Sequence, residues 1–472
     1  MNRNIQVTNP YNGSTDYSFN EPDSSLITQR CELLKSNQPS WASLQIQERI
    51  EALNEFGEAI NRNNSELIKA LQVDTGRSHI SRLEVQSISA FIKRLSNEST
   101  NALEASTSKP SSIQNIEGST LQTPYGLVGN ISPWNFPIIL SFLDTLPALV
   151  SGNAVIIKPS EVTPRWIKPM LKAIGECPKI AEVLDIIPGT GNAGKELINH
   201  IDALVFTGGV STGKKVAVNA AKNFIPAFLE LGGKDPAVIL ASADVKKAAE
   251  TIVFCACQCS GQACQSLERI YVHHSLHDEF LKMVIHLTSK LELNYPDIDK
   301  GVIGPFILRD QANKVKAQID SAIKDGAILH CGGELINNGG IWMSPAVLTQ
   351  VNHDMELMQQ ETFGPVIPIT PFKNNHEAIN LANDSKYGLS ASVFAGTLEE
   401  ARNFGSKIKA GAISLNDASL TALIHEFEHN SFGFSGMGAS RSGLSSYTRF
   451  TRAQSIMANT SENGPLLKSV YN

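Results

Sequence analysis

The sequence has no long apolar run and no strong excess of one charge. No segment approaches the ~18 consecutive apolar residues that a transmembrane helix needs. The opening stretch, MNRNIQVTNPYNGSTDYSFN, has none of the apolar core of a secretory signal. The formal net charge is −6 over 472 residues and the pI is about 6.0, whereas a nucleic-acid partner would call for a basic face. We therefore expect a cytoplasmic protein with no membrane and no nucleic-acid partner.

Cysteine is also scarce, with seven residues in the whole chain. A chain of this length can bury a large core in two or three domains, so it needs no disulfides for stability. We expect Cys31, Cys177 and Cys331 to be buried thiols that pack as small apolar side chains. The other four lie within ten residues, in CACQCSGQAC at 255–264.

The spacing of the first three thiols in this stretch argues against a metal site. Structural zinc sites usually take cysteines two to four residues apart, with a second pair or histidines at a set distance. Here Cys255, Cys257 and Cys259 are spaced C-x-C-x-C, and the next histidine is His273. Residues two apart on a helix point about 200° apart. We therefore predict no metal, and three small apolar residues on a buried helix.

Cys264 differs from its neighbours because it lies where a helical pattern gives way to a strand-like one. A thiol at such a junction can lie near helix-end dipoles or backbone N–H groups, which stabilise the reactive thiolate. A buried inert thiol fits the same position. The cysteine stretch alone leaves both interpretations open.

Strand-like and helical patterns alternate along the chain. Residues 24–99 are helical in period. Their clearest apolar stripe consists of Ile50, Leu53, Phe56 and Ile60. The strand-like segments GLVGNIS, AVIIKPS, VLDIIPG and ALVFTGG then alternate with helical ones, and a second such stretch follows 232. This order predicts an α/β fold with parallel, doubly wound sheets that bind ligands at the carboxyl ends of their strands. Segments near 112–126 and 445–460 predict a small antiparallel piece.

Several motifs at strand ends carry polar groups. PWNFP follows the first strand, and the amide of Asn135 could stabilise an oxyanion or bond its own turn. LELGGKDP places Glu230 beside leucines, as a general base or as a structural carboxylate. IIKPSE ends with Lys158 and Glu161, where a nucleotide ribose could lie. FTGGVSTG at 206–213 is a glycine-bearing turn whose N–H groups could face a pyrophosphate.

In order, PWNFP, KPSE, FTGGVSTG, LELGGK, GQAC and ETFGPV resemble the motifs of the aldehyde dehydrogenase superfamily, over residues 25–455. The resemblance implies a Rossmann-like cofactor domain, an α/β catalytic domain and a small β oligomerisation element in a homodimer or homotetramer. We assign 1–105 and 125–231 to the NAD-binding domain and 232–440 to the catalytic domain. The oligomerisation element takes 106–124 and 441–472.

The resemblance also implies a catalytic set. Cys264 would be the nucleophile, and the Asn135 side chain with the Cys264 N–H would hold the oxyanion. Glu230 would activate the water that hydrolyses the thioester. Glu361 would hold the nicotinamide ribose, with Phe363 near the ring. The further cofactor-binding residues would be Trp134, Lys158, Glu161, Gly208, Gly209, Gly213 and Leu231. A carboxylate at Glu161 favours NAD over NADP, although NADP remains possible.

The helix after PWNFP would line the substrate tunnel with Leu140 and Leu143, which favours an apolar aliphatic or aromatic aldehyde. A succinate-semialdehyde-type enzyme would need a cation for the distal carboxylate, which Arg165 or Arg441 could supply. A CoA-acylating enzyme is disfavoured by the presence of Glu230. A non-catalytic nucleotide-binding scaffold is disfavoured by Cys264 and Glu230 together.

The sequence departs from the family pattern at three places. Cys259 stands where the family often has Asn, and Gly209 removes a hydroxyl from the phosphate turn. The motif SFGFSGMG at 431–438 is shortened. Before it lies IHEFEHN, whose polar residues are His425, Glu426, Glu428 and His429. This loop is either solvated or a polar gate that reads the distal group of a substrate.

Overall fold

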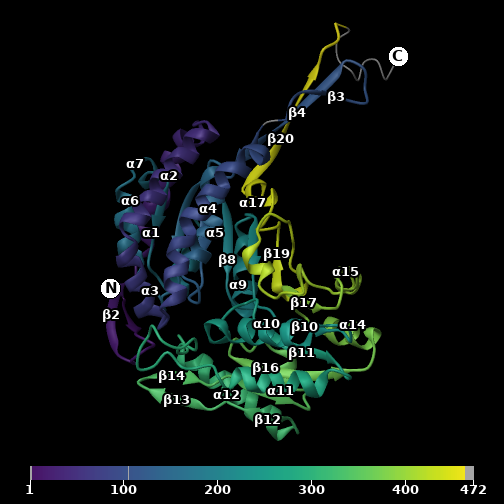
Figure 1. The fold of residues 1–472 in the computed structure, drawn as a ribbon. Coiled ribbons are helices and arrows are strands. Elements are labelled where there is room, and N and C mark those ends of the chain that lie inside the picture. Colours follow the sequence, from purple (N-terminus) through teal and green to yellow (C-terminus); the bar gives the residue numbers. More distant parts are fainter. Residues whose placement is uncertain (1–2, 105, 463–472) are drawn as a thin grey trace.

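The computed structural model describes residues 3–104 and 106–462. Two α/β bodies stand one above the other, and a long antiparallel arm projects from the upper one (Figure 1). Within the described residues, no helix has both the length and the apolar character required to cross a bilayer. All seven cysteines lie in the described part of the chain and are free thiols.

The upper body is built on a six-stranded sheet in the order β19-β9-β8-β5-β6-β7. Its strands are β5 (Leu127–Ile131), β6 (Ala154–Lys158), β7 (Leu184–Ile186), β8 (Ala203–Thr207), β9 (Ala227–Glu230) and β19 (Gly436–Met437). All pair in parallel except β19, which is antiparallel to β9. The four predicted strand segments are thus confirmed. The strand order reverses at β5, so the crevice beside β5 is where such a sheet binds ligands.

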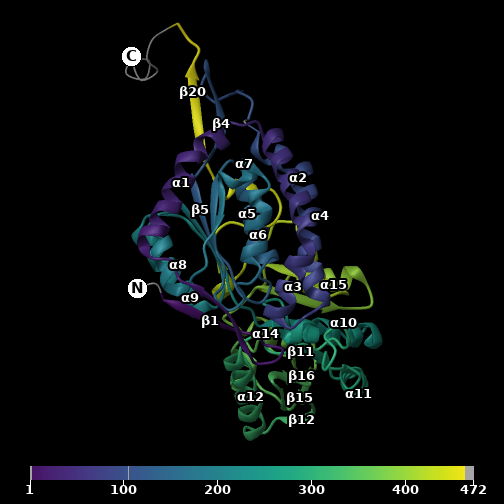
Figure 2. The same ribbon diagram turned by 90° about the vertical axis from the view of Figure 1, so that its left-hand side faces the viewer.

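Helices cover both faces of this sheet (Figure 2). On one face lie α1 (Ser24–Ala42), α8 (Gly191–Leu197) and α9 (Val210–Lys222), and on the other α5 (Ile139–Val150) and α6 (Ile167–Gly175). The remaining helices of this body are α2 (Ile46–Arg62), α3 (Asn64–Thr75), α4 (His79–Leu103), α7 (Pro178–Ala181) and α17 (Ser445–Thr448). The predicted stripe on α2 is buried, since Ile50, Leu53, Phe56 and Ile60 are each at most 2% exposed. Burial of both sheet faces explains why these strands are apolar throughout.

The lower body is built on a seven-stranded sheet in the order β12-β15-β16-β11-β10-β17-β18. Its strands are β10 (Asp235–Ile239), β11 (Leu267–His273), β12 (Ile328–Cys331), β15 (Ala346–Thr349), β16 (Val366–Phe372), β17 (Ser390–Phe394) and β18 (Ala412–Leu415). Its helices are α10 (Val245–Cys257), η1 (Gln258–Gly261), α11 (His277–Thr288), α12 (Arg309–Lys324), α13 (Glu356–Gln359), α14 (Asn375–Asn383), α15 (Leu398–Gly405), α16 (Leu420–Leu423) and η2 (Gly433–Ser435). Asp244 caps α10, accepting from the Lys247 N–H at 3.0 Å.

The arm consists of β3 (Lys109–Pro110), β4 (Ile116–Pro124) and β20 (Thr451–Asn459). β20 pairs antiparallel with β4 along its full length, from Thr451↔Pro124 to Asn459↔Ile116. Both predicted segments of the antiparallel piece are therefore confirmed. Two hairpins complete the fold: β1 (Asn4–Thr8) with β2 (Thr15–Asn20), and β13 (Leu335–Asn338) with β14 (Gly340–Met343).

The domain boundaries drawn from the sequence remain a prediction. β19 lies inside the segment assigned to the catalytic domain, yet its residues pair with β9 of the upper sheet. The parts of the assignment that fall on 1–2, 105 and 463–472 lie outside the described residues.

Candidate active site

Cys264 lies in the short loop between η1 and β11. The helix α10 ends at Cys257, and three successive residues, Cys259, Ser260 and Gly261, then take positive φ angles of 55°, 57° and 67°. A Cβ on Gly261 would lie 2.2 Å from the Gly364 carbonyl, so only glycine fits this approach. The chain therefore reverses direction and seats the cysteine loop against the segment 361–366.

The other cysteines partly depart from the sequence prediction. Cys31, Cys177, Cys257 and Cys259 are buried as expected. Cys255 and Cys331 are only partly buried, and Cys331 is so because β12 is the edge strand of its sheet. Cys259 lies beyond the end of α10. Among the described residues, no group of three or more His, Cys, Asp or Glu side chains is placed to hold a metal ion.

Cys264 is partly buried, and the residue keeps intermediate exposure to solvent. Burial, together with the negative charges of Asp235, Glu361 and Glu230, raises the pKa of Cys264 to about 12, against the opposing effect of Arg441. This environment disfavours the thiolate in the resting protein, so the junction alone does not activate Cys264.

Asn135 reaches the cysteine loop from the loop after β5. Its side chain is buried, and its Nδ2 donates to the Gln262 carbonyl at 3.1 Å. The amide thus bonds the cysteine loop, two residues before Cys264. Arg77 holds the two loops together, because its guanidinium donates to the carbonyls of Asn135 and Cys259, both at 2.9 Å.

Glu230 is the last residue of β9, and its side chain is 21% exposed. Three residues later, a Cβ on Gly233 would lie only 2.5 Å from the Cys264 carbonyl oxygen. The segment that follows Glu230 therefore packs against the backbone of Cys264. Arg441 lies beside this carboxylate, with Nε 3.9 Å from Glu230 Oε1.

Lys158 and Glu161 lie at the carboxyl end of β6. The Lys158 Nζ donates to the Gly189 carbonyl at 2.9 Å and lies 3.6 Å from Glu161 Oε2. Burial lowers the pKa of Lys158, against the raising effect of Glu161. The side chain of Glu161 is 38% exposed, so its carboxylate can reach a ligand in the crevice.

The glycine turn joins β8 to α9. Gly208 donates its N–H to the Glu230 carbonyl at 3.0 Å, and Gly209 is the N-cap of α9 with open space in front of it. A Cβ on Gly213 would lie 2.5 Å from a methyl of Leu231, so this glycine allows α9 to pack tightly against the segment after β9. The open helix N-terminus can accept a pyrophosphate.

Glu361 and Phe363 come from the loop before β16. The Gly233 N–H donates to Glu361 Oε1 at 3.1 Å, and burial raises the pKa of Glu361 to about 7. The ring of Phe363 lies edge-on to that of Trp134, with centroids 5.4 Å apart. Trp134 of the upper body and Phe363 of the lower body, both predicted to contact the cofactor, thus pack against each other.

A buried ion pair supports this loop. Lys234 Nζ lies 2.7 Å from Glu268 Oε2, and both side chains are at most 3% exposed. The Glu268 carboxylate also accepts from the N–H groups of Thr362 and Phe363, both at 2.7 Å. Sequence reasoning did not find Glu268 or Arg77 as parts of the site, and it considered Arg441 only as a cation for a substrate carboxylate.

The predicted tunnel wall is α5, which begins beside a buried carboxylate. Glu84 Oε2 accepts from the N–H groups of Ile138 and Ile139 at 3.1 and 3.2 Å. Leu143 is 7% exposed and Leu140 is half-buried. The main hydrophobic cluster of the upper body includes Ile138, yet Leu143 is outside it.

The polar loop at 424–430 bonds mainly to its own part of the chain. The ring of His425 lies 6.3 Å from that of Phe91, and burial together with Arg94 and Arg441 lowers the pKa of His425 to about 4. Glu428 accepts from the Ser445 N–H and hydroxyl at 2.9 and 2.8 Å. His425 is therefore a neutral, half-buried side chain at neutral pH.

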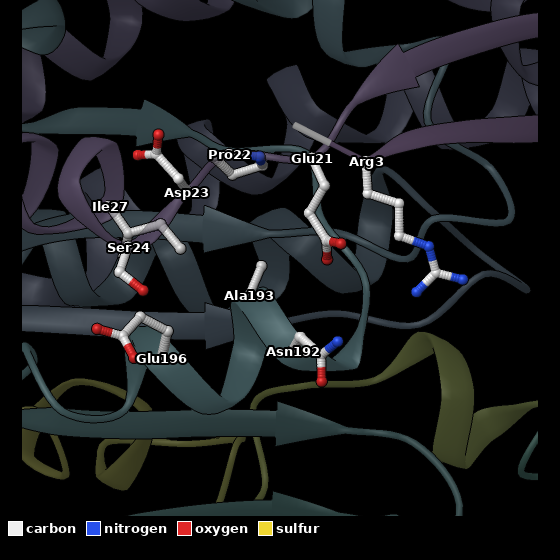
Figure 3. Close-up of a pocket in the computed structure, with 9 residues that line it drawn as sticks. All are labelled: Arg3, Glu21, Pro22, Asp23, Ser24, Ile27, Asn192, Ala193 and Glu196. Carbon is white, nitrogen blue, oxygen red and sulfur yellow. The ribbon is translucent and has the colours of Figure 1, made fainter. Parts of the chain in front are cut away.

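A surface hollow lies at the edge of the upper body, between the start of α1 and α8 (Figure 3). It is lined by Arg3, Glu21, Pro22, Asp23, Ser24, Ile27, Asn192, Ala193 and Glu196. None of these is among the residues predicted for catalysis or cofactor binding. Glu21 instead accepts from the Thr190 N–H at 2.8 Å, which fixes the turn before α8.

The chain matches one known family over most of its length. The model of the aldehyde dehydrogenase family matches residues 1–456. The chain belongs to this family. The 4,4'-diapolycopene aldehyde oxidase of Methylomonas sp is 33% identical over 450 residues, covering 93% of this chain and 82% of that protein. This aldehyde dehydrogenase therefore oxidises an aldehyde with NAD or NADP, as the sequence predicted.

Solved structures agree with the fold. A putative aldehyde dehydrogenase, PutA, from Anabaena variabilis is 44% identical, with a TM-score of 0.96 over 98% of this chain and 99% of that one. The betaine aldehyde dehydrogenase of Staphylococcus aureus in complex with NAD+ is 26% identical, with a TM-score of 0.88 over 98% and 93%. The predicted fold class, enzyme class and cofactor class are confirmed.

Proposed function

We propose that Cys264 carries the oxidation covalently. Its sulfur adds to the aldehyde carbon, forming a C–S bond, and the carbonyl oxygen becomes an alkoxide. Because the thiol keeps intermediate exposure, its proton can leave to solvent. The supporting observation is the convergence of the Asn135 amide, the Cys264 loop and the strand ending in Glu230 at one crevice.

Asn135 stabilises the alkoxide in this proposal. Its amide is already aimed at the cysteine loop, and Arg77 fixes the loop that carries it. A donor placed before the reaction begins costs no reorganisation when charge develops. The backbone N–H of Cys264 is the second donor.

The hydride of the former aldehyde carbon would leave to the nicotinamide, which is the chemistry that NAD or NADP supplies, and a thioester would remain on Cys264. The residues present fit such a cofactor: Lys158 and Glu161 would hold the adenosine ribose, and the open N-terminus of α9 would face the pyrophosphate. Glu361 and Phe363 would hold the nicotinamide end. The partly exposed carboxylate of Glu161 favours NAD, since it would repel a 2′-phosphate.

Glu230 then takes a proton from a water molecule that attacks the thioester carbon. The C–S bond breaks, the carboxylic acid leaves and the sulfur is regenerated. The carboxylate is 21% exposed, so water can reach it.

The substrate we favour is an apolar aliphatic or aromatic aldehyde. In this proposal the half-buried Leu140 and the buried Leu143 line the tunnel wall after Asn135. The two arginines considered for a distal carboxylate are engaged elsewhere: Arg165 with the carboxylates of Asp74 and Asp16, and Arg441 with that of Asp144 at 2.8 Å. Both observations favour an apolar aldehyde over succinic semialdehyde.

NADH or NADPH formation with hexanal, benzaldehyde and succinic semialdehyde, with and without CoA, tests this proposal. We expect the first two to react without CoA, NAD to be preferred, and Cys264→Ser to lose turnover. Retained turnover in the Cys264→Ser variant would rule out the covalent mechanism.

We also propose a homodimer or homotetramer in the cytoplasm. β20 and β4 form an arm that stands clear of the body, with Ile456 and Met457 exposed (Figure 1). β18 is the edge of the lower sheet. An exposed edge and an apolar arm suit pairing with a second copy, and seven free thiols fit a reducing compartment.

A further inference from the structure

Arg441 makes a set of contacts that no step described so far uses. It lies between β19 and α17, and its side chain is only 12% exposed. Its guanidinium donates to both carboxylate oxygens of Asp144, at 3.2 and 2.8 Å, and to the Thr207 hydroxyl at 2.6 Å. The same Nε that donates to Asp144 lies 3.9 Å from Glu230 Oε1, an ion-pair distance without a hydrogen bond.

The contacts join three parts of the active site. Asp144 belongs to α5, the proposed tunnel wall, and Thr207 ends β8 at the glycine turn. Glu230 ends the neighbouring strand β9, which pairs with β8 at this very position, Thr207↔Glu230. A guanidinium anchored at two fixed points therefore presents its charge to the base in one defined direction.

Two guanidinium groups share one buried carboxylate close to Glu230. Arg441 and Arg449 both contact Asp144, and the side chains of Arg449 and Asp144 are at most 1% exposed. The guanidinium groups stay charged at every relevant pH, whereas Asp144 supplies one negative charge. The carboxylate of Glu230 also lies within 4 Å of Arg441.

The same cation also acts on the nucleophile. Around Cys264, the charges of Asp235, Glu361 and Glu230 disfavour thiolate and Arg441 favours it. Burial lowers the pKa of Arg441 itself, but Asp144 and Glu230 outweigh that effect and raise it. Arg441 thus remains charged beside two groups that must both lose a proton to work.

We propose that Arg441 is a positioning residue that orients the Glu230 carboxylate and supports the Cys264 thiolate. This inference rests on the roles proposed above for Cys264 and Glu230. The rival interpretation is purely structural, with Arg441 only tying the segment after β19 to α5.

The test compares Arg441→Gln with Arg441→Lys, which keeps the charge, and with Arg30→Gln as a matched control. Arg30 also pairs with a carboxylate of the same body, Asp185 on β7, at 2.8 Å. β7 lies four strand spacings from β9, roughly 19 Å away. The readouts are the pH profile of kcat, the KM for hexanal, and the rate of Cys264 alkylation by iodoacetamide at pH 8.

We expect Arg441→Gln to move the acid limb of kcat upward by about one pH unit and to slow alkylation by up to about tenfold, with an unchanged KM. Arg441→Lys should restore both values, and Arg30→Gln should move neither. If Arg441→Gln does not fold, Arg441→Met, which is similar in length and apolar, takes its place.

A lower kcat with an unmoved pH profile and unchanged alkylation would overturn the inference in favour of a structural role. A raised KM with unchanged kcat would also overturn it, since Arg441 would then bind the substrate. Both outcomes differ from failure of the proposed function, which would appear as turnover in Cys264→Ser.

Discussion

The Asn135 amide donates to the carbonyl of Gln262, two residues before the proposed nucleophile, at 3.1 Å. The amide and the thiol loop are thereby fixed relative to each other before any substrate arrives. We expect Asn135→Ala to lower kcat by ~10²–10³-fold, the usual loss for one oxyanion donor. Steady-state NADH formation checks this.

Alkylation of Cys264 in the Asn135→Ala variant is the control, since Arg77 still holds the loop. Alkylation at the wild-type rate with low kcat supports the oxyanion role. A kcat close to that of the wild type would contradict it.

Glu230→Gln separates the two halves of the reaction. The thioester should still form, with one NADH per active site, because only hydrolysis needs the base. The steady-state rate should fall by ~10²–10⁴-fold, which is the rate enhancement that a general base usually contributes. Stopped-flow absorbance measures both phases, and an equal fall in both would show that Glu230 is not specific to hydrolysis.

The raised pKa of Cys264 predicts a steep pH dependence of its reactivity. With a pKa of about 12, the thiolate fraction rises about tenfold for each pH unit between 7 and 10. The alkylation rate of the cofactor-free protein should follow this slope, read by mass spectrometry at the Cys264 peptide. A plateau near neutral pH would show a thiolate that the structure does not predict.

The Lys234–Glu268 pair predicts a large effect on stability. Lys234→Met leaves the Glu268 carboxylate buried with two N–H partners but no cation, which costs about 3–5 kcal/mol. Urea unfolding should show this loss. Adding Glu268→Gln to Lys234→Met should recover part of it, and the inference of a coupled pair fails if the two losses simply add.

Asp235 predicts a stability that falls as pH rises. Burial raises its pKa to about 8, against hydrogen bonds from Ser390. Between pH ~4 and about 8 the folded state therefore keeps a proton that the unfolded state has lost, so unfolding becomes easier with rising pH. Asp235→Asn should remove this slope and stabilise the protein at pH 8 by a few kcal/mol, on the order expected for a buried carboxyl. Urea unfolding at pH 5 and 8 gives the comparison, and equal slopes in both proteins would contradict it.

Local patterns in the sequence were sufficient for most of the fold. The four strands β5 to β8 are short, apolar and separated by helical periods, and each formed where expected. The N-cap at Asp244 and the stripe on α2 follow from the same local rules. Such features depend on residues close in sequence, so one chain suffices to predict them.

The supporting residues could not be predicted because they act across long sequence separations. Arg77 meets Cys259 of the lower body, and Arg441 meets Asp144, which lies 297 residues earlier in the chain. Both contacts form only in the folded protein. Nothing in the local sequence of either arginine indicates a partner. The sequence also did not predict the pairing of β19 with β9, because a strand of two residues carries no periodic signal.

The late position of β19 in the chain has a consequence for synthesis on the ribosome. Residues 436–437 close the edge of the strand that ends in Glu230, and Arg441 follows them directly. Because a nascent chain emerges from its N-terminus, the edge of β9 stays open until residues 436–437 have been made, long after the strand itself has left the ribosome. The surroundings of Glu230 are therefore completed late, and a fragment truncated before 436 should lack activity.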